Sequence, residues 1–414
     1  MTNSDKLKIL FDYKYTDDLS KDKCDINTQP TVQSVALKNR INFVGYSIVG
    51  SMNLIRPDVR FLLKQIYTHI FVDDKEDRAI GALVGLVVGD AMGAPLEFKP
   101  LQYGKVFVTD MESLETDNRF GLKPGQWTDD TSMALCLCDS LIEKKGFDPI
   151  DTMLRYLNWW YNGYNNATMF DFTTQNHQSV GLGGNIGMSF DKFIQDGRPY
   201  TSAGDCKTSG NGSIMRLAPV AIANHSNLNK CLQVARASSY VTHRGIEAAE
   251  CCALLSLIIV NGINTGDKSF INNLHNHFVS KVKSVNYLAA SWAELDSNGV
   301  IDPDRDWRWK SPGFKYSPER SQKQPGYIGS YSMDGMAMAL HCFYTTKNFV
   351  DCVLKAVNLC GDADSVGAIA GQIAGAYYGV SSIPQKWIDC FMRWDGGGTI
   401  AYRASLLYQL NKGK

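Results

Sequence analysis

The sequence predicts an all-α protein, and three features of the chain lead to that prediction. After about residue 76, apolar residues recur at i, i+3 and i+4 in one segment after another, which is the spacing of amphipathic helices. Two further segments carry a glycine at every fourth position. Alternating β-branched runs bounded by hairpin turns, which would indicate a sheet, are nearly absent.

The amphipathic segments are distributed along the whole of this region. The clearest of them span residues 132–145, 213–223, 246–260, 335–346 and 349–360. We expect each to form a helix with one buried face. A polar, proline-containing stretch at 302–329 interrupts the pattern and predicts a long loop. Loops of that length in compact domains are often functional or else disordered.

The glycine-spaced segments indicate how the core is packed. Each has carboxylates at one end: Gly81, Gly85, Gly89 and Asp90 in the first, and Asp362, Asp364, Gly367, Gly371, Gly375 and Gly379 in the second. Glycine costs a helix about 1 kcal/mol relative to alanine, so several per helix are tolerable only where another helix approaches the backbone closely. We therefore predict a tightly packed helical core with an acidic site at its edge.

Composition and charge narrow the class of protein. The 414 residues are enough for two average domains, or for one large domain with an appendage. Hydrophobic residues make up 44% and charged residues 20% of the chain, as in an ordinary soluble globular protein. The 42 basic and 42 acidic side chains cancel, so no overall positive field attracts a nucleic acid. We expect neither a nucleic-acid partner nor a membrane.

Three further features bear on location. The apolar stretch at 79–89 is much shorter than the ~20 residues that span a bilayer, so we expect a buried helix there. The first residues lack the apolar stretch and cleavage site of a signal peptide. The 11 cysteines are scattered, without paired CxxC motifs at zinc spacing. These observations favour a cytoplasmic protein with reduced cysteines in its core.

The amino-terminal part of the chain differs from the rest in composition and in helical periodicity. Residues 1–76 are rich in lysine and aspartate and show no sustained helical period before residues 60–71. The acidic run at 73–78 then has the character of a helix start. We therefore predict an N-terminal extension at 1–76 and one large domain at 77–414. The extension is either a partner-binding arm or a small helical unit packed on that domain.

The strongest chemical pattern is WTDDTSMAL, in which Thr128, Asp129, Asp130 and Thr131 open an apolar helix. One interpretation is a helix cap, because hydroxyl and carboxylate groups accept hydrogen bonds from the free N–H groups of a first turn. Capping accounts for one acid better than for two adjacent acids between two hydroxyls. The other interpretation is a set of ligands for a hard divalent cation.

A second cluster, in CGDADSVGAIAG, has the same character. Asp362, Asp364 and Ser365 also open an apolar helix, and capping is again one interpretation. Several carboxylate and hydroxyl oxygens within one turn are also what Mg²⁺, Mn²⁺ or Ca²⁺ accepts. The spacing leaves both interpretations open, although two such clusters together favour a metal site.

Five segments, in order along the chain, resemble the ADP-ribosylglycohydrolases. They are GLVVGDAMGAPLEF at 85–98, GQWTDDTSMAL at 125–135, SGNGSIMRLAPVA at 209–221, SSYVTHRG at 238–245 and GDADSVGAIAGQIAGAYYG at 361–379. Each segment alone would be a weak match, whereas five collinear matches are specific. On this basis the chain is identified as a member of that family.

The resemblance implies an orthogonal bundle of helices around a cleft that holds two Mg²⁺ or Mn²⁺ ions. By matching positions it implies these ligands: Thr128, Asp129, Asp130, Asp362, Asp364 and Ser365. It places Glu97 opposite the scissile bond, so that Glu97, Asp129 and Asp130 are the candidates for the catalytic base. Asp90 either orients these ligands or is a structural acid at a helix end.

The resemblance also implies a loop that binds the diphosphate of ADP-ribose, formed by Thr208, Ser209, Gly210, Asn211 and Gly212. Its glycines would let backbone N–H groups approach phosphate oxygens. His243 matches a histidine near the distal ribose or phosphate, the alternative being a hydrogen-bonded core histidine. The glycine-rich stretch at 181–187 follows no predicted strand, which argues against a dinucleotide-binding fold. We expect this stretch to line the cleft.

Two positions depart from the family pattern. Cys360 stands where a glycine is common, and Ser365 stands where a threonine is common. Neither change removes a ligand oxygen, because serine keeps the hydroxyl. The serine resembles the arginine-directed branch of the family.

The reaction that the resemblance implies is hydrolysis of the N-glycosidic bond between ADP-ribose and an arginine of a modified protein. An alternative is a hydrolase of ADP-ribosyl-serine or O-acetyl-ADP-ribose, with the same metal site and a different leaving-group pocket. Another is a binding protein that occludes a partner through residues 1–76. Both roles would combine in an immunity protein that blocks an ADP-ribosylating toxin and reverses its modification.

Overall fold

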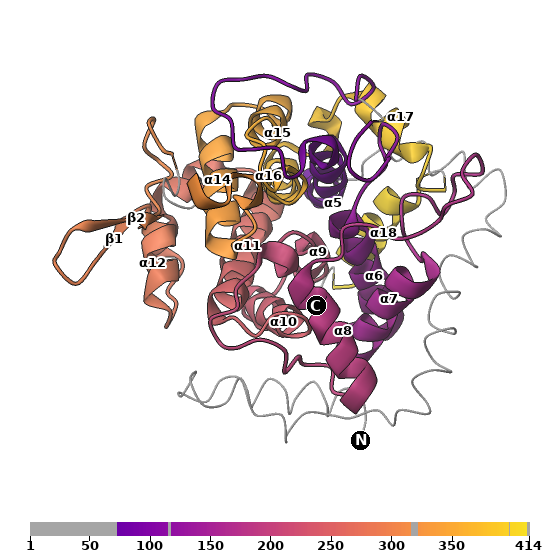
Figure 1. Ribbon diagram of the computed structural model, residues 1–414, viewed down its shortest axis with the longest axis horizontal. Coiled ribbons are helices and arrows are strands. Elements are labelled where there is room, and N and C mark those ends of the chain that lie inside the picture. Colours follow the sequence, from indigo (N-terminus) through magenta and orange to yellow (C-terminus); the bar gives the residue numbers. More distant parts are fainter. Residues whose placement is uncertain (1–72, 115–116, 316–321, 397, 412–414) are drawn as a thin grey trace.

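The computed structural model describes residues 73–114, 117–315, 322–396 and 398–411. Within these residues helices form nearly all of the regular structure, which confirms the all-α prediction (Figure 1). The predicted extension at 1–76 lies almost entirely outside the described residues, as does the helical period at 60–71. The division at residue 76 therefore stays a prediction.

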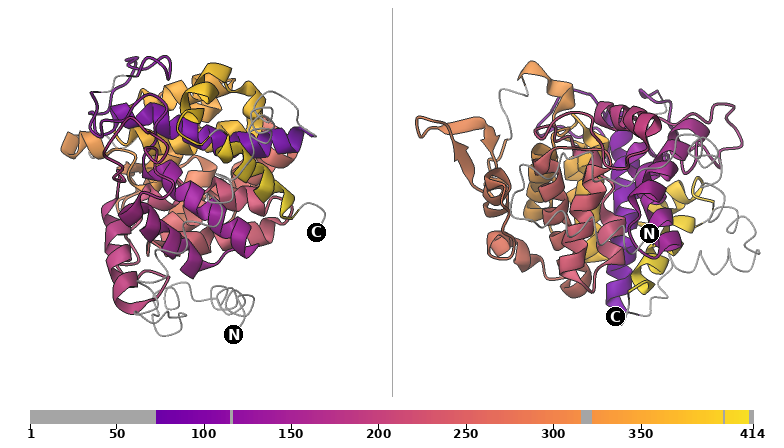
Figure 2. Two further views of the ribbon diagram at one scale, coloured as in Figure 1. Left: turned by 90° about the vertical axis from the view of Figure 1, so that its right-hand side faces the viewer. Right: turned by 90° about the horizontal axis from the view of Figure 1, so that it is seen from below.

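The helices are mostly short and follow one another around a central pair (Figures 1 and 2). The α-helices are α5 (Asp74–Gly93), α6 (Asp129–Lys144), α7 (Pro149–Asn162), α8 (Gly184–Asp196), α9 (Ala218–Ala223), α10 (Leu228–Tyr240), α11 (Ile246–Thr265), α12 (Lys283–Ala290), α14 (Ser332–Thr345), α15 (Phe349–Val357), α16 (Ala363–Tyr378), α17 (Gln385–Met392) and α18 (Thr399–Gln409). The 3₁₀ turns are η3 (Ala94–Leu96), η4 (Asn211–Ser213), η5 (Lys268–Asn276), η6 (Pro325–Tyr327) and η7 (Val380–Ser382).

Helices α5 and α16 form the central pair, and their glycines are in backbone contact, as predicted. The glycines face one another in antiparallel register: Gly81 with Gly375, Gly85 with Gly371, and Gly89 with Gly367. A β-carbon built on Gly371 would lie 2.0 Å from the carbonyl oxygen of Gly85, far inside van der Waals contact. The register brings the end of α5, which carries Asp90, beside the start of α16, which carries Asp364.

Two predicted boundaries are wrong. Only residues 218–223 of the expected helix at 213–223 form α9, because Pro219 has no N–H to donate and is accommodated only in a first turn. The expected loop at 302–329 begins with a strand, since β1 (Ala293–Leu295) pairs antiparallel with β2 (Ile301–Asp306). The carboxylate of Asp296 closes this hairpin by accepting hydrogen bonds from the N–H groups of Asn298 and Val300.

Helices α5 and α11 are long and apolar enough, by length and composition, to cross a membrane. Their most apolar windows are 94% and 83% buried inside the molecule. Burial against other helices therefore explains their composition, and the expectation of a buried helix at 79–89 is confirmed. Most cysteines of the described residues are buried among apolar side chains.

Candidate active site

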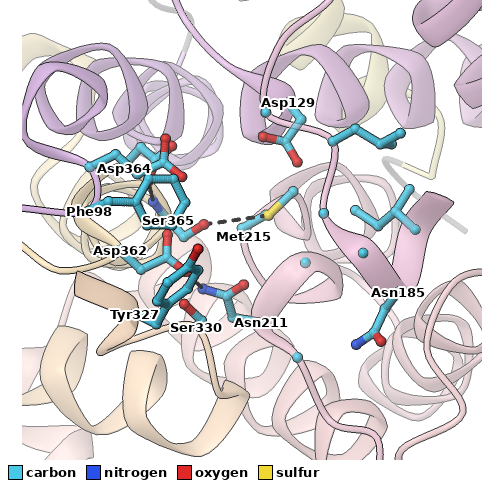
Figure 3. A pocket seen from close by; sticks show the side chains of 18 of the residues that line it. Phe98, Asp129, Asn185, Asn211, Met215, Tyr327, Ser330, Asp362, Asp364 and Ser365 are labelled. Atoms are coloured by element: carbon cyan, nitrogen blue, oxygen red, sulfur yellow. Dashed lines mark hydrogen bonds between the residues drawn. The ribbon is translucent and has the colours of Figure 1, made fainter. Parts of the chain in front are cut away.

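A polar cavity of about 500 Å³ lies where α5, α6 and α16 meet (Figure 3). Its lining contains carboxylates, glycines and aromatic rings from segments far apart in the sequence. The residues that line it are Glu97, Phe98, Arg119, Phe120, Asp129, Trp160, Gly181, Leu182, Gly183, Gly184, Asn185, Ile186, Gly210, Asn211, Gly212, Met215, His243, Tyr327, Ser330, Asp362, Asp364 and Ser365. The glycine-rich stretch at 181–187 is therefore at the cavity, as expected, and half of it is the first turn of α8.

Asp90 supplies the cap of α6 from a different helix. Its carboxylate accepts hydrogen bonds from the N–H of Thr128 at 3.0 Å and from the N–H of Thr131 at 2.9 Å. It also accepts one from the Thr128 hydroxyl at 2.9 Å. Thr128 itself makes no side-chain cap bond to its own helix. Because Asp90 performs the capping, the side chains of Asp129 and Asp130 are left for another role.

The start of α16 meets the start of α6 across the cavity. The Thr128 hydroxyl lies 3.3 Å from Asp364 Oδ2, and the Ser365 hydroxyl lies 3.5 Å from Asp130 Oδ2. The amide of Asn211 donates to Asp362 Oδ2 at 2.9 Å. These contacts join Thr128 with Asp364 and Asp130 with Ser365 across two helix starts more than 230 residues apart, and Asp129 and Asp362 line the same cavity.

Glu97 joins the carboxylates of α16. It follows η3, the short turn that ends α5, and one oxygen each from Glu97, Asp362 and Asp364 lie within 4.8 Å of one another. Among the described residues, Glu97 Oε2 and Asp130 Oδ1 are buried without a hydrogen-bond partner. A buried polar atom without a partner is costly, and a bound cation would satisfy both of these carboxylate oxygens.

The electrostatics of this cluster favour a cation. Burial raises the pKa of Asp129, of Asp130 and of Asp364 well above the ordinary value of an aspartate, and the neighbouring carboxylates raise each further. Burial also raises the pKa of Glu97 to about 9, with the charges of Asp362 and Asp129 acting in the same direction. Carboxylates that destabilise one another in a buried site are relieved by a divalent cation, whose preferred ligands are oxygens. The cluster can therefore bind such an ion.

The predicted diphosphate loop is only partly at the cavity. Gly210, Asn211 and Gly212 line it, whereas Thr208 and Ser209 do not. The Thr208 hydroxyl bonds to Asp205, and the Ser209 hydroxyl accepts from a backbone N–H of α11. The structure therefore does not bring the side chains of Thr208 and Ser209 into the site. Their hydrogen bonds instead join the loop to Asp205 and to α11.

His243 packs directly against the glycines of this loop. A β-carbon on Gly212 would lie 2.9 Å from the His243 ring, so only glycine leaves room for both the ring and the cavity. His243 Nδ1 lies 2.8 Å from the Thr242 hydroxyl, which in turn accepts a hydrogen bond from Arg216. Burial lowers the pKa of His243 to about 3, and the charge of Arg216 adds to this effect. His243 is both a hydrogen-bonded buried histidine and part of the cavity wall.

The depressed pKa of His243 predicts a specific loss of stability in acid. The unfolded histidine takes up a proton below about pH 6.5 and the folded one does not, so the free energy of unfolding falls as the pH drops from 6.5 toward 3. Between pH 6.5 and pH 5 this contribution is about 2 kcal/mol, at 1.36 kcal/mol per pH unit. Urea unfolding at pH 7 and pH 5 should show that wild type loses about this much more than His243→Gln. Equal losses in the two proteins would contradict the assignment.

The structure adds site residues for which we had no prediction. Phe98 and Arg119 line the cavity from loops and Tyr327 lines it from the turn η6, whereas Asn185 belongs to the stretch at 181–187 that we expected there. Phe98 directly follows Glu97, and Tyr327 lies within the stretch at 302–329, whose length indicated a functional loop or disorder. Arg119 stands in no recognisable motif, and nothing in the sequence pointed to it.

Cys360 adopts a left-handed backbone conformation, with φ of 63°. Glycine enters this region without strain, whereas an L-residue does so at a cost. The glycine that is common at this position in the family therefore has a structural reason. The departure at Cys360 alters backbone strain beside the site and leaves every oxygen of the carboxylate cluster in place.

A buried cluster of carboxylates in a ligand-sized polar cavity defines the site of a hydrolase that works with a divalent cation. The sequence comparisons give the family. Residues 72–412 match the model of the family described as ADP-ribosylglycohydrolase, and the chain belongs to this family. It is therefore an enzyme that hydrolyses ADP-ribose conjugates.

Individual relatives agree with this assignment. The chain is 34% identical to the ADP-ribosylarginine hydrolase Tri1 of Pseudomonas putida (strain GB-1), over 76% of this chain and 74% of that protein. It is 29% identical to the ADP-ribosyl-[dinitrogen reductase] glycohydrolase of Rhodospirillum rubrum, over 76% of this chain and 90% of that protein. A solved structure titled "ADP-ribosylglycohydrolase-related protein complex" superposes with a TM-score of 0.61 at 31% identity, covering 81% of this chain and 99% of that chain.

Proposed function

We propose that the chain removes ADP-ribose from arginine side chains of modified proteins by hydrolysing the N-glycosidic bond, with two Mg²⁺ or Mn²⁺ ions as cofactors. The observation that carries the proposal is the joining of the two helix starts into one buried carboxylate cluster at the cavity. Relatives named for arginine hydrolysis and for dinitrogen reductase support the linkage.

The residues fit divalent cations. Thr128, Asp129 and Asp130 would contribute oxygens from α6, and Asp362, Asp364 and Ser365 from α16. The partnerless Asp130 Oδ1 and the raised pKa values of the buried aspartates support this assignment. When bound, the ions would supply Lewis-acid activation of water and a template for the ribose hydroxyls.

The remaining roles fall to the protein's own groups. The backbone of Gly210–Gly212 and the first turn of α8, which has no side-chain cap, would bind the diphosphate. Positive charge develops on the ribose as the glycosidic bond breaks, and the surrounding carboxylates would stabilise it. Glu97 or one of the aspartates would accept the proton of the attacking water.

Release of ADP-ribose tests the proposal directly. The full chain is incubated with an arginine-ADP-ribosylated protein in Mg²⁺, in Mn²⁺ or in EDTA, and with serine-linked and O-acetyl ADP-ribose in parallel. We expect metal-dependent release from arginine. Release only from serine or acetyl conjugates would overturn the arginine assignment and keep the reaction class. Absence of release from every conjugate would favour a binding function.

Glu97→Gln tests the role of the glutamate. The amide has nearly the same size but cannot accept a proton, so kcat should fall about 10²- to 10⁴-fold. Because Glu97 also belongs to the carboxylate cluster, the rise in melting temperature on adding Mg²⁺ is measured in the same variant and separates loss of proton transfer from loss of metal binding. Near-normal turnover with intact Mg²⁺ binding would remove Glu97 from the mechanism and leave the aspartates as candidates for the base.

The proposal also covers which protein carries the modification and which enzyme attaches it. A cytoplasmic protein modified by an ADP-ribosylating toxin fits the arginine linkage, and residues 1–76 would then bind the toxin itself. Deletion of residues 1–70 separates the two roles. Loss of toxin binding with retained hydrolysis is expected, whereas unchanged binding would show that the catalytic domain makes the contact.

A further inference from the structure

Two aromatic rings stand at the edge of the carboxylate cluster. The ring centroids of Phe98 and Tyr327 are 4.9 Å apart with the planes tilted by 52°, and both rings line the cavity. Figure 3 shows them beside Asp362 and Asp364. The side chain of Tyr327 is 56% exposed, so this end of the cavity faces solvent. We call Phe98 and Tyr327 the aromatic platform.

The aromatic platform is held in a fixed position relative to the carboxylates. Phe98 has a left-handed φ of 63°, and its N–H donates to the carbonyl of Gly361 at 2.8 Å. On the other side, the loop that carries Tyr327 packs so closely that a β-carbon on Gly326 would lie 2.6 Å from the Phe98 carbonyl. A non-glycine residue persists in this conformation only where its surroundings impose it. The backbone of Phe98, the residue after Glu97, is thereby held next to the start of α16.

A guanidinium already lies against one ring of the aromatic platform. The Arg119 Cζ lies 4.4 Å from the centroid of the Phe98 ring, in cation–π geometry. Arg119 is exposed and reaches the cavity from a loop. The charge of Arg119 also lowers the pKa of Glu97, partly opposing the effect of burial. The contact shows that a guanidinium stacks on the Phe98 ring within the lining of the cavity.

We propose that the aromatic platform binds the guanidinium of the substrate's arginine, and that Arg119 occupies this place until the substrate displaces it. The inference rests on the proposed function and adds how the leaving group, the arginine side chain, is recognised. Phe98 directly follows Glu97, and both rings line the cavity near Asp362 and Asp364, so the platform lies next to the groups proposed to act on the glycosidic bond (Figure 3). A delocalised cation gains from an aromatic face, and a serine hydroxyl or an acetate gains much less. The platform therefore selects arginine conjugates over oxygen-linked ones.

The test measures recognition of the leaving group separately from recognition of ADP-ribose. Phe98→Leu and Tyr327→Leu should each raise KM for an ADP-ribosyl-arginine substrate roughly three- to thirtyfold with little change in kcat, the range expected for loss of one cation–π contact. The Kd for free ADP-ribose, measured by calorimetry with Mg²⁺, should stay unchanged because this ligand has no guanidinium. Arg119→Met removes the competing cation and should lower KM severalfold. Phe172→Leu, at a ring that is 90% exposed and outside the cavity, is the matched control.

The outcomes distinguish failure of the platform proposal from failure of the proposed function. If wild type releases no ADP-ribose from arginine conjugates, the proposed function fails and the platform proposal fails with it. If wild type is active and both leucine variants keep the wild-type KM, only the platform proposal is overturned. Equal losses of substrate and ADP-ribose binding would also overturn it, because the rings would then contact ADP-ribose. Tyr327→Leu keeps the test valid if Phe98→Leu does not fold, since the exposed Tyr327 side chain contributes little to the core.

Discussion

Replacing Asp129 and Asp130 with alanine should abolish metal-dependent release of ADP-ribose, with kcat/KM falling at least about 10³-fold. Groups that only orient a metal ligand cost about 10- to 100-fold in affinity or activity when they are removed, so removal of two ligands should cost more. The rise in melting temperature on adding Mg²⁺ should disappear in the same variant. Both carboxylates are buried at the cluster, and Asp130 Oδ1 has no protein partner to replace the ion.

The same variant should still fold. Burial and the neighbouring carboxylates raise the pKa of both aspartates, so in EDTA their removal relieves repulsion and should not lower the melting temperature. Asp389→Ala, which removes an exposed carboxylate on α17, is the matched control and should change neither property. Retained Mg²⁺-dependent turnover in the double variant would show that the metal site is elsewhere.

The choice between capping and metal binding could not be made from the sequence because the deciding residue is distant along the chain. The cap of α6 comes from Asp90, 38 positions before Thr128. The sequence around Thr128 shows that acids stand at the start of a helix, but it does not show which carboxylate accepts the hydrogen bonds of the first turn. Asp90 reaches that position only because the helices are packed together in the folded chain, and its capping releases Asp129 and Asp130 from that role.

The fold was more predictable than the rims of the cavity. Helices that are apolar over most of their length, such as α11 and α14, appear near where the sequence predicted them, because nearly all of their residues are buried in the core. Phe98 and Arg119 lie in loops and Tyr327 lies in the short turn η6, all without an apolar period, and only tertiary contacts bring them together. The hairpin at β1 and β2 was missed because strands of three and six residues give too short an alternation to recognise.

Gly371→Val should prevent the domain from folding, the largest stability effect we expect. The new β-carbon would lie 2.0 Å from a carbonyl oxygen of α5, and a backbone atom cannot rotate away as a side chain can. The helices would have to separate, which would also break the neighbouring contacts of Gly81 with Gly375 and of Gly89 with Gly367. Overpacking usually costs about 1–3 kcal/mol, and loss of a whole backbone interface should exceed that and consume most of a typical stability of about 5–15 kcal/mol.

Urea unfolding of the variant beside Gly187→Ala provides the measurement and its control. Gly187 lies inside α8, where an added β-carbon would meet only the side chain of Leu182 at 3.5 Å, an ordinary contact. Alanine should therefore stabilise α8 by up to about 1 kcal/mol. A folded Gly371→Val protein of near wild-type stability would contradict the packing of α5 on α16. It would also remove the reason why Asp90 and Asp364 meet, because the same backbone contact brings their two helix ends together.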